Sequence, residues 1–198
     1  MASQLDLIGR IPVKLKPESG RTEPRLWVRR LVVWSDPKTV LREVRLRPGL
    51  NIVWSPDPAD RDRPGEGDGG LGHGSGKTLF CRLVRYCLGE ERFAPDRQRD
   101  RIAHAFKDGL VGAEVVVDGT AWAVVRSIGM TRKHLAVQGG DLEALAVSNS
   151  SSTGMGPLLD AVENVVITNP VAELISADGP PQAWLAALAW LTRDQECR

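Results

Sequence analysis

The stretch Gly72-His73-Gly74-Ser75-Gly76-Lys77-Thr78 decides how this sequence is interpreted, together with the apolar repeat that follows it. From Lys77 to Leu88, apolar side chains recur four residues apart in two adjacent rows, which begin at Leu79 and Phe80. This spacing predicts a helix with one buried stripe and with Arg82 and Arg85 on its outer side, and Gly89 is a natural helix stop. A glycine-rich turn that leads directly into an amphipathic helix is therefore the element around which the rest of the fold is predicted.

Each residue type in this stretch suits the binding of a polyphosphate. Glycines let backbone N–H groups converge without Cβ clashes, and a helix N-terminus adds free amides and the positive end of its dipole. Lys77 would bring a positive charge to the β- and γ-phosphates, and the Thr78 hydroxyl is a hard ligand for Mg²⁺. We expect ATP with magnesium to be bound here. The residues expected around the phosphates are Gly72, His73, Gly74, Ser75, Gly76, Lys77, Thr78 and Leu79.

The stretch departs from the standard phosphate-binding loop at its first position. The pattern G-x-x-x-x-G-K-[ST] requires glycine where this chain has Leu71. The apolar run Leu50 to Trp54, predicted as the buried strand before the loop, also ends well before Gly72. Residues 55–71 between them are rich in proline, glycine and charge, which predicts an inserted, solvent-exposed loop. The alternative is a chance match in a glycine-rich region, and the flanking strand and helix argue against it.

Further elements are predicted on both sides of this segment. Asp118-Gly119 joins two β-rich runs and is a strong hairpin signal. Residues 1–24 carry three prolines and predict a loosely packed arm, while residues 139–156 predict a flexible loop, so the lobe itself spans 25–198. Strands are predicted at 26–34, 40–46, 111–117 and 120–128, and helices at 98–106, 158–166 and 182–191. The four tryptophans in or beside predicted strands (Trp27, Trp34, Trp54 and Trp122) are expected to pack in the core.

Composition places few limits on function. The chain has 198 residues, 42% of them hydrophobic and 26% charged, and a formal net charge of +1. That charge does not by itself indicate nucleic-acid binding, and the arginine clusters near residues 25–30 and 97–101 are interpreted as solvated surface. Three cysteines match no metal template and are expected to be reduced thiols. The absence of a signal-like or membrane-spanning apolar run predicts a cytoplasmic protein with no membrane partner.

These features together resemble a known family. The segment Pro48 to Trp54, the Gly74 to Thr78 motif and the helix ending at Leu88-Gly89 look like the N-terminal lobe of SMC/RecF/RecN-type ATPase heads, which are relatives of ABC ATPases. The resemblance implies an α/β P-loop NTPase fold with a mixed sheet and an antiparallel β-hairpin subdomain. The inserted loop is similar to a bacterial subgroup with coiled-coil middles, often found in phage- or plasmid-defence loci. The implied partners are a second head, which makes a homodimer around ATP, and DNA.

The family resemblance also bears on catalysis. Leu191-Thr192-Arg193-Asp194-Gln195 resembles the family's Q-loop, which implies that Gln195 contacts magnesium and the attacking water alongside Lys77 and Thr78; the alternative is a polar residue with no such role. A Walker B acid, a signature motif and a switch histidine are not found in the sequence. Asp118 is followed by glycine where the acid should be, and the hairpin explains it better. We therefore expect the N-terminal half of a head, completed by a C-terminal lobe, with little ATP turnover alone.

Two other functions stay open at this stage. One is a small-molecule kinase built on the same loop, with an arginine-rich lid; the predicted antiparallel hairpin argues against it. The other is a non-catalytic, nucleotide-gated scaffold that restrains an effector subunit, which the missing Walker B acid would suit.

Overall fold

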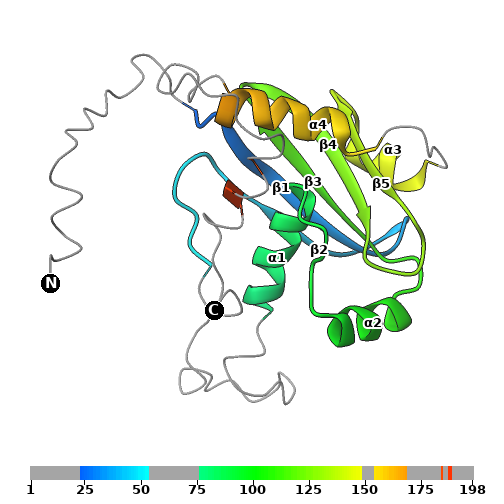
Figure 1. The fold of residues 1–198 in the computed structure, drawn as a ribbon. Helices are drawn as coiled ribbons and strands as arrows, with labels where there is room; N and C mark the ends of the chain where they lie inside the picture. Colours follow the sequence, from blue (N-terminus) through cyan, green and yellow to red (C-terminus); the bar gives the residue numbers. More distant parts are fainter. Residues whose placement is uncertain (1–22, 54–75, 149–153, 169–183, 185–186, 189–198) are drawn as a thin grey trace, which may run out of the picture.

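The computed structural model describes residues 23–53, 76–148, 154–168, 184 and 187–188, and its centre is one five-stranded antiparallel sheet. The strands lie in the order β2-β1-β3-β4-β5, and every described pair is antiparallel (Figure 1). The strands are β1 (Leu26–Asp36), β2 (Thr39–Arg45), β3 (Leu110–Val117), β4 (Thr120–Ser127) and β5 (His134–Gln138). The protein is thus an α/β protein, but the mixed sheet expected from sequence is not what the described strands form.

The β3–β4 hairpin forms where the Asp118-Gly119 signal predicts it. Both turn residues have positive φ angles, 48° at Asp118 and 80° at Gly119, as a two-residue type I′ turn requires. The hairpin pairs Val117 with Thr120 and continues in unbroken register to Leu110 and Ser127. Asp118 is therefore an exposed turn residue, and the hairpin interpretation holds for it.

A bulge in β1 decides which side chains reach each face of the sheet. The register to β3 shifts between Val28 and Arg30, so that Val28 and Leu31 both contribute to the larger core cluster. An odd spacing between two core residues breaks the alternation of a regular strand, and the extra residue of a bulge is what permits it. Beyond the bulge, Val32 and Trp34 contribute to a second cluster on the opposite face.

The larger core lies between the sheet and the helices α1 (Lys77–Cys87) and α4 (Gly156–Val162). Leu83 and Cys87 from α1, and Leu158 and Val162 from α4, are all buried in this cluster. The π-helical segment η5 (Glu163–Thr168) continues directly from α4. By contrast, α2 (Asp96–Ala105) fully buries none of its residues, and its half-buried Ile102 packs against the larger core.

A short helix, α3 (Leu142–Val147), covers the second face of the sheet, inside the region 139–156 that was predicted as a flexible loop. The Asp141 carboxylate accepts a hydrogen bond from the Ala144 amide and caps this helix. Leu142 and Ala146, one helical turn apart, are buried in the same cluster as Trp34. The prediction of a flexible loop therefore missed the helix α3, which is stabilised by its N-cap and by packing against the sheet.

Two further predictions are wrong in the described residues. The buried strand expected at Leu50 to Trp54 is not formed over residues 50–53; Leu50 is 73% exposed and Ile52 78% exposed. The Asn51 side chain instead closes a turn, donating to the Arg47 and Gly49 carbonyls and accepting from the Arg47 amide. Trp54 and the inserted loop 55–71 lie outside the described residues, as does the arm up to residue 22.

The second error concerns the arginines of α1, which the helical repeat places on the outer, solvated side. Arg82 is 8% exposed and Arg85 7% exposed. The chain after α1 covers them: Arg82 donates to the Gln98 side-chain carbonyl at 3.4 Å, and Arg85 pairs with the Glu90 carboxylate. The helical repeat alone does not predict the burial of these arginines, because the residues that cover them come from a segment outside the helix.

Candidate functional site

The N-terminus of α1 is where the described part of the predicted phosphate loop lies. Gly76 has a left-handed φ of 71° and directly precedes Lys77, the first residue of the helix. A side chain at Gly76 would meet no atom within 4 Å, so glycine is favoured here for its backbone angle rather than for space. The chain thus turns sharply into the helix at the position where the sequence motif requires it to.

The first turn of α1 leaves its positive end open to solvent. Gly76, Lys77 and Thr78 are exposed, and no side chain among the described residues caps the helix. The first turn contains no acidic residue, so no carboxylate of α1 offsets the partial positive charge of the N-terminal amides. These features give a surface suited to an anion.

Leu79 differs from the other predicted ligands, because its side chain is half-buried and packs against the larger core. Only its backbone amide is therefore suited to a phosphate, while its side chain helps to seat the helix. Gly72, His73, Gly74, Ser75 and Gln195 lie outside the described residues, so their contribution to the site beside Lys77 and Thr78 stays a prediction.

The opposite end of α1 is held by Arg126 of β4, which is 7% exposed. Its Nη1 donates to the Tyr86 carbonyl and, at 2.7 Å, to the Glu90 carbonyl, so a cation satisfies backbone acceptors at the C-terminal end of the helix. The guanidinium carbon lies 3.5 Å from the centroid of the Tyr86 ring, a cation–π contact. Burial lowers the pKa of Arg126, while Tyr86 and Cys87 act in the opposite direction.

His134, the cross-strand partner of Arg126 on β5, completes this group of side chains. Arg126 Nε donates to His134 Nδ1 at 3.2 Å, and the imidazole meets the Tyr86 ring edge-on at 6.3 Å between centroids. Burial, and then the charge of Arg126, lower the pKa of His134 below its ordinary value of 6.5. His134 is thus held as a neutral hydrogen-bond acceptor.

Sequence reasoning did not identify Arg126 and His134 as a pair, although one signal was present. Trp122, Val124 and Arg126 are spaced two residues apart along the hairpin strand. Their side chains therefore point to the same, core-facing side of the sheet. The strand β5, which brings His134 opposite Arg126, was not predicted, because it is only five residues long and follows a loop with no clear turn motif.

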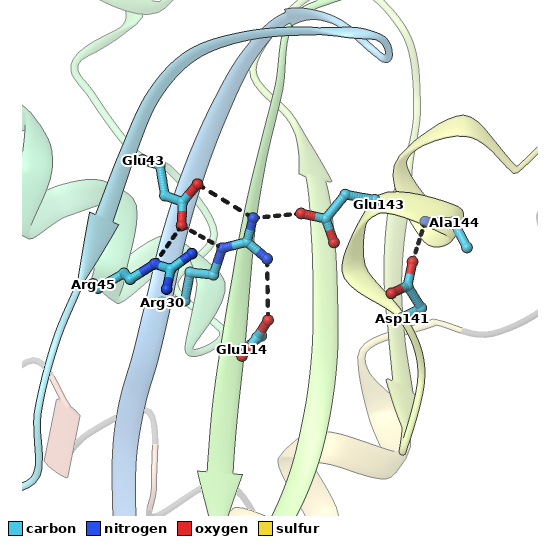
Figure 2. Close-up of polar contacts among 7 residues, drawn as sticks. All are labelled: Arg30, Glu43, Arg45, Glu114, Asp141, Glu143 and Ala144. Carbon is cyan, nitrogen blue, oxygen red and sulfur yellow. Dashed lines mark hydrogen bonds and ion pairs between the residues drawn. The ribbon is translucent and has the colours of Figure 1, made fainter.

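Arg30 is the centre of a second polar group, on the opposite face of the sheet (Figure 2). It pairs with Glu43 of β2 at 3.0 Å, with Glu114 of β3 at 3.3 Å and with Glu143 of α3. Burial would lower the pKa of Arg30, but the hydrogen bonds to the three carboxylates outweigh it and raise the pKa. The group joins four elements and is satisfied internally, which indicates a structural role.

Other sites are not evident in the described part of the chain. No group of three or more His, Cys, Asp or Glu side chains there is placed to hold a metal ion. None of the helices in the described ranges is both long and apolar enough to cross a bilayer. No protein-family model matches the sequence, and no curated protein matches it. The N-terminus of α1 is therefore identified as a candidate site by its own residues.

Proposed function

We propose that this chain binds the phosphates of ATP, with magnesium, at the N-terminus of α1. The observation that carries the proposal is the exposed turn at Gly76, followed at once by Lys77 and Thr78 on a helix whose other side is buried in the core. Backbone amides and the Lys77 ammonium would hold the polyphosphate, and Thr78 would supply a hydroxyl ligand to Mg²⁺. Bound magnesium supplies charge neutralisation at the phosphates.

The proposal extends to the N-terminal half of an SMC-like ATPase head, which dimerises on ATP and performs work on DNA, in phage or plasmid defence. It rests on the Gly74 to Thr78 motif with the helix that follows it, and on the absence of a Walker B acid from the sequence; a C-terminal lobe would supply that acid. The segment at residues 50–53, which does not form the expected strand, adds no support. The antiparallel sheet argues against the alternative of a small-molecule kinase, which would be built on a parallel sheet. Gln195 would orient water in the complete head.

Nucleotide binding is tested by titrating the full chain with a fluorescent ATP analogue and Mg²⁺. Lys77→Ala is expected to weaken binding by roughly tenfold or more, because a charge-assisted contact to phosphate is lost. Lys107→Ala removes an exposed lysine elsewhere and is the matched control. Equal binding by wild type and Lys77→Ala would contradict the proposed site.

The half-head proposal has a separate test, the rate of ATP hydrolysis. The chain by itself is expected to show turnover close to background, because the acid that polarises the attacking water is supplied by another lobe. Robust turnover that is lost in Lys77→Ala would overturn this part of the proposal and leave the binding site intact.

A further inference from the structure

The C-terminal end of α1 is held by one side chain whose contacts depend on a histidine. Arg126 binds the Tyr86 and Glu90 carbonyls, where α1 ends and the chain turns away. The amides of Leu88, Gly89 and Glu90 close this turn, with hydrogen bonds to Val84, Tyr86 and Arg85 carbonyls at 3.1 Å each. Arg126 therefore joins the end of α1 to the middle of the sheet.

The proton on His134 decides whether Arg126 keeps its third contact. The Arg126 guanidinium has only donors, so the 3.2 Å contact with His134 Nδ1 requires an imidazole that carries its single proton on Nε2. Protonation would place a second N–H and a positive charge against the guanidinium. Because His134 is solvent-exposed, it can take up a proton without the protein unfolding.

We infer that His134 and Arg126 form a pH-sensitive anchor for α1, in which protonation of His134 displaces Arg126 and loosens the C-terminal end of the helix. The consequence for nucleotide affinity, but not the loosening itself, rests on the proposed function. The same helix begins at Lys77, so a looser C-terminal end would lower the affinity of its N-terminus for phosphate by making the helix less ordered before binding.

The surroundings of His134 offer little to compensate its charge. From α1 and the turn after it come the neutral Tyr86 ring and the Arg85–Glu90 ion pair, in which the carboxylate is already engaged. From α4, which packs against β5, the single charged residue is the exposed Asp160. The neighbouring Lys133 is a further cation, whose amine donates to the Leu145, Ala146 and Ser148 carbonyls.

The direction of the pH effect follows from the lowered pKa of His134. In the unfolded chain the imidazole binds its proton near pH 6.5, whereas in the folded protein it does so at a lower pH. The anchor is therefore intact above about pH 6.5 and is lost as the pH falls through the folded pKa.

The experiment is amide hydrogen exchange of the full chain at about pH 7.5 and about pH 4.5, about two units below the ordinary pKa of histidine, corrected for intrinsic exchange rates. Protection of the Leu88, Gly89 and Glu90 amides is expected to fall by roughly tenfold at the lower pH, the scale of one hydrogen bond to a charged group. His134→Asn keeps an acceptor near the Nδ1 position but cannot be protonated, and its protection should stay constant. His104→Asn, at an exposed histidine on α2, should behave as wild type.

Two outcomes would overturn the inference: unchanged protection in the wild type, or an equal fall in His134→Asn. A parallel titration with the ATP analogue should show weaker binding at the lower pH in the wild type and not in His134→Asn. If no nucleotide binds at either pH, the proposed function fails, while the exchange result still decides whether the anchor exists.

Discussion

Cys81 and Cys87 show how burial separates the chemistry of two identical side chains on one helix. Cys81 is exposed, whereas Cys87 is fully buried in the larger core. Burial raises the pKa of the Cys87 thiol to about 12, and the charge of Arg126 acts in the opposite direction. Since the thiolate is the reactive form, Cys87 is both inaccessible and protonated at neutral pH.

Alkylation should therefore distinguish the two thiols. At about pH 8, iodoacetamide is expected to modify Cys81 in the native protein and to leave Cys87 unmodified until denaturant is added. Mass spectrometry of tryptic peptides reads the two separately, because Arg82 and Arg85 lie between them. Equal native labelling at both positions would show that the core around α1 is more open than described.

The β3–β4 hairpin is the element whose conformation depends most directly on single residues. The turn needs a positive φ of 80° at Gly119, and a Cβ there would meet no atom within 4 Å. A substitution at this position is therefore unfavourable because of the backbone alone. A substitution at Gly119 therefore measures the energetic cost of the left-handed backbone conformation without a contribution from steric clashes.

Gly119→Ala is expected to lower the free energy of unfolding by about 1 kcal/mol, the cost of a left-handed conformation for a residue with a Cβ. The measurement is urea denaturation followed by tryptophan fluorescence. Gly154→Ala is the matched control, because its surroundings are equally open and its φ is not positive. A loss of similar size in both variants would mean that the turn geometry is not the cause.

At the scale of the whole molecule, Trp184 connects segments that are far apart in sequence. Its indole N–H donates to the Leu88 carbonyl at 3.0 Å, across 96 residues, and its backbone amide donates to the Glu163 carboxylate at 2.6 Å. Trp184 and Leu188 are both buried in the larger core. Trp184 is thus tied to the end of α1 and to the start of η5.

Trp184→Phe keeps most of the packing but leaves the Leu88 carbonyl without this donor, so it should destabilise the protein by about 1–2 kcal/mol. Trp27→Phe is the control, since the buried Trp27 indole N–H has no acceptor among the described residues and loses no hydrogen bond. Thermal unfolding of both variants compares them directly. An equal loss at both positions would indicate that ring size, not the hydrogen bond, is responsible.

Several elements whose conformation depends on neighbouring residues were predicted correctly. The structure has a helix at the α1 repeat, strands at the β1 and β2 runs, and a turn at Asp118-Gly119. In each case the local sequence favours the conformation that the fold contains. The candidate site was predicted from the same kind of signal, a glycine turn before a helix, and Gly76, Lys77 and Thr78 are exposed at the start of α1. The order of the five strands was not predicted, because pairing depends on contacts between distant segments.

The sequence by itself determined the helix that carries Lys77, the glycine turn before that helix and the β3–β4 hairpin. Each of these depends on residues that are close together in the sequence. Only the tertiary structure decided that Arg82 and Arg85 are buried, that residues 50–53 stand outside the sheet, and that Arg126 meets His134 at the end of α1. The physical reason is that burial and ion pairing are set by which segments pack together, and no local pattern specifies that choice.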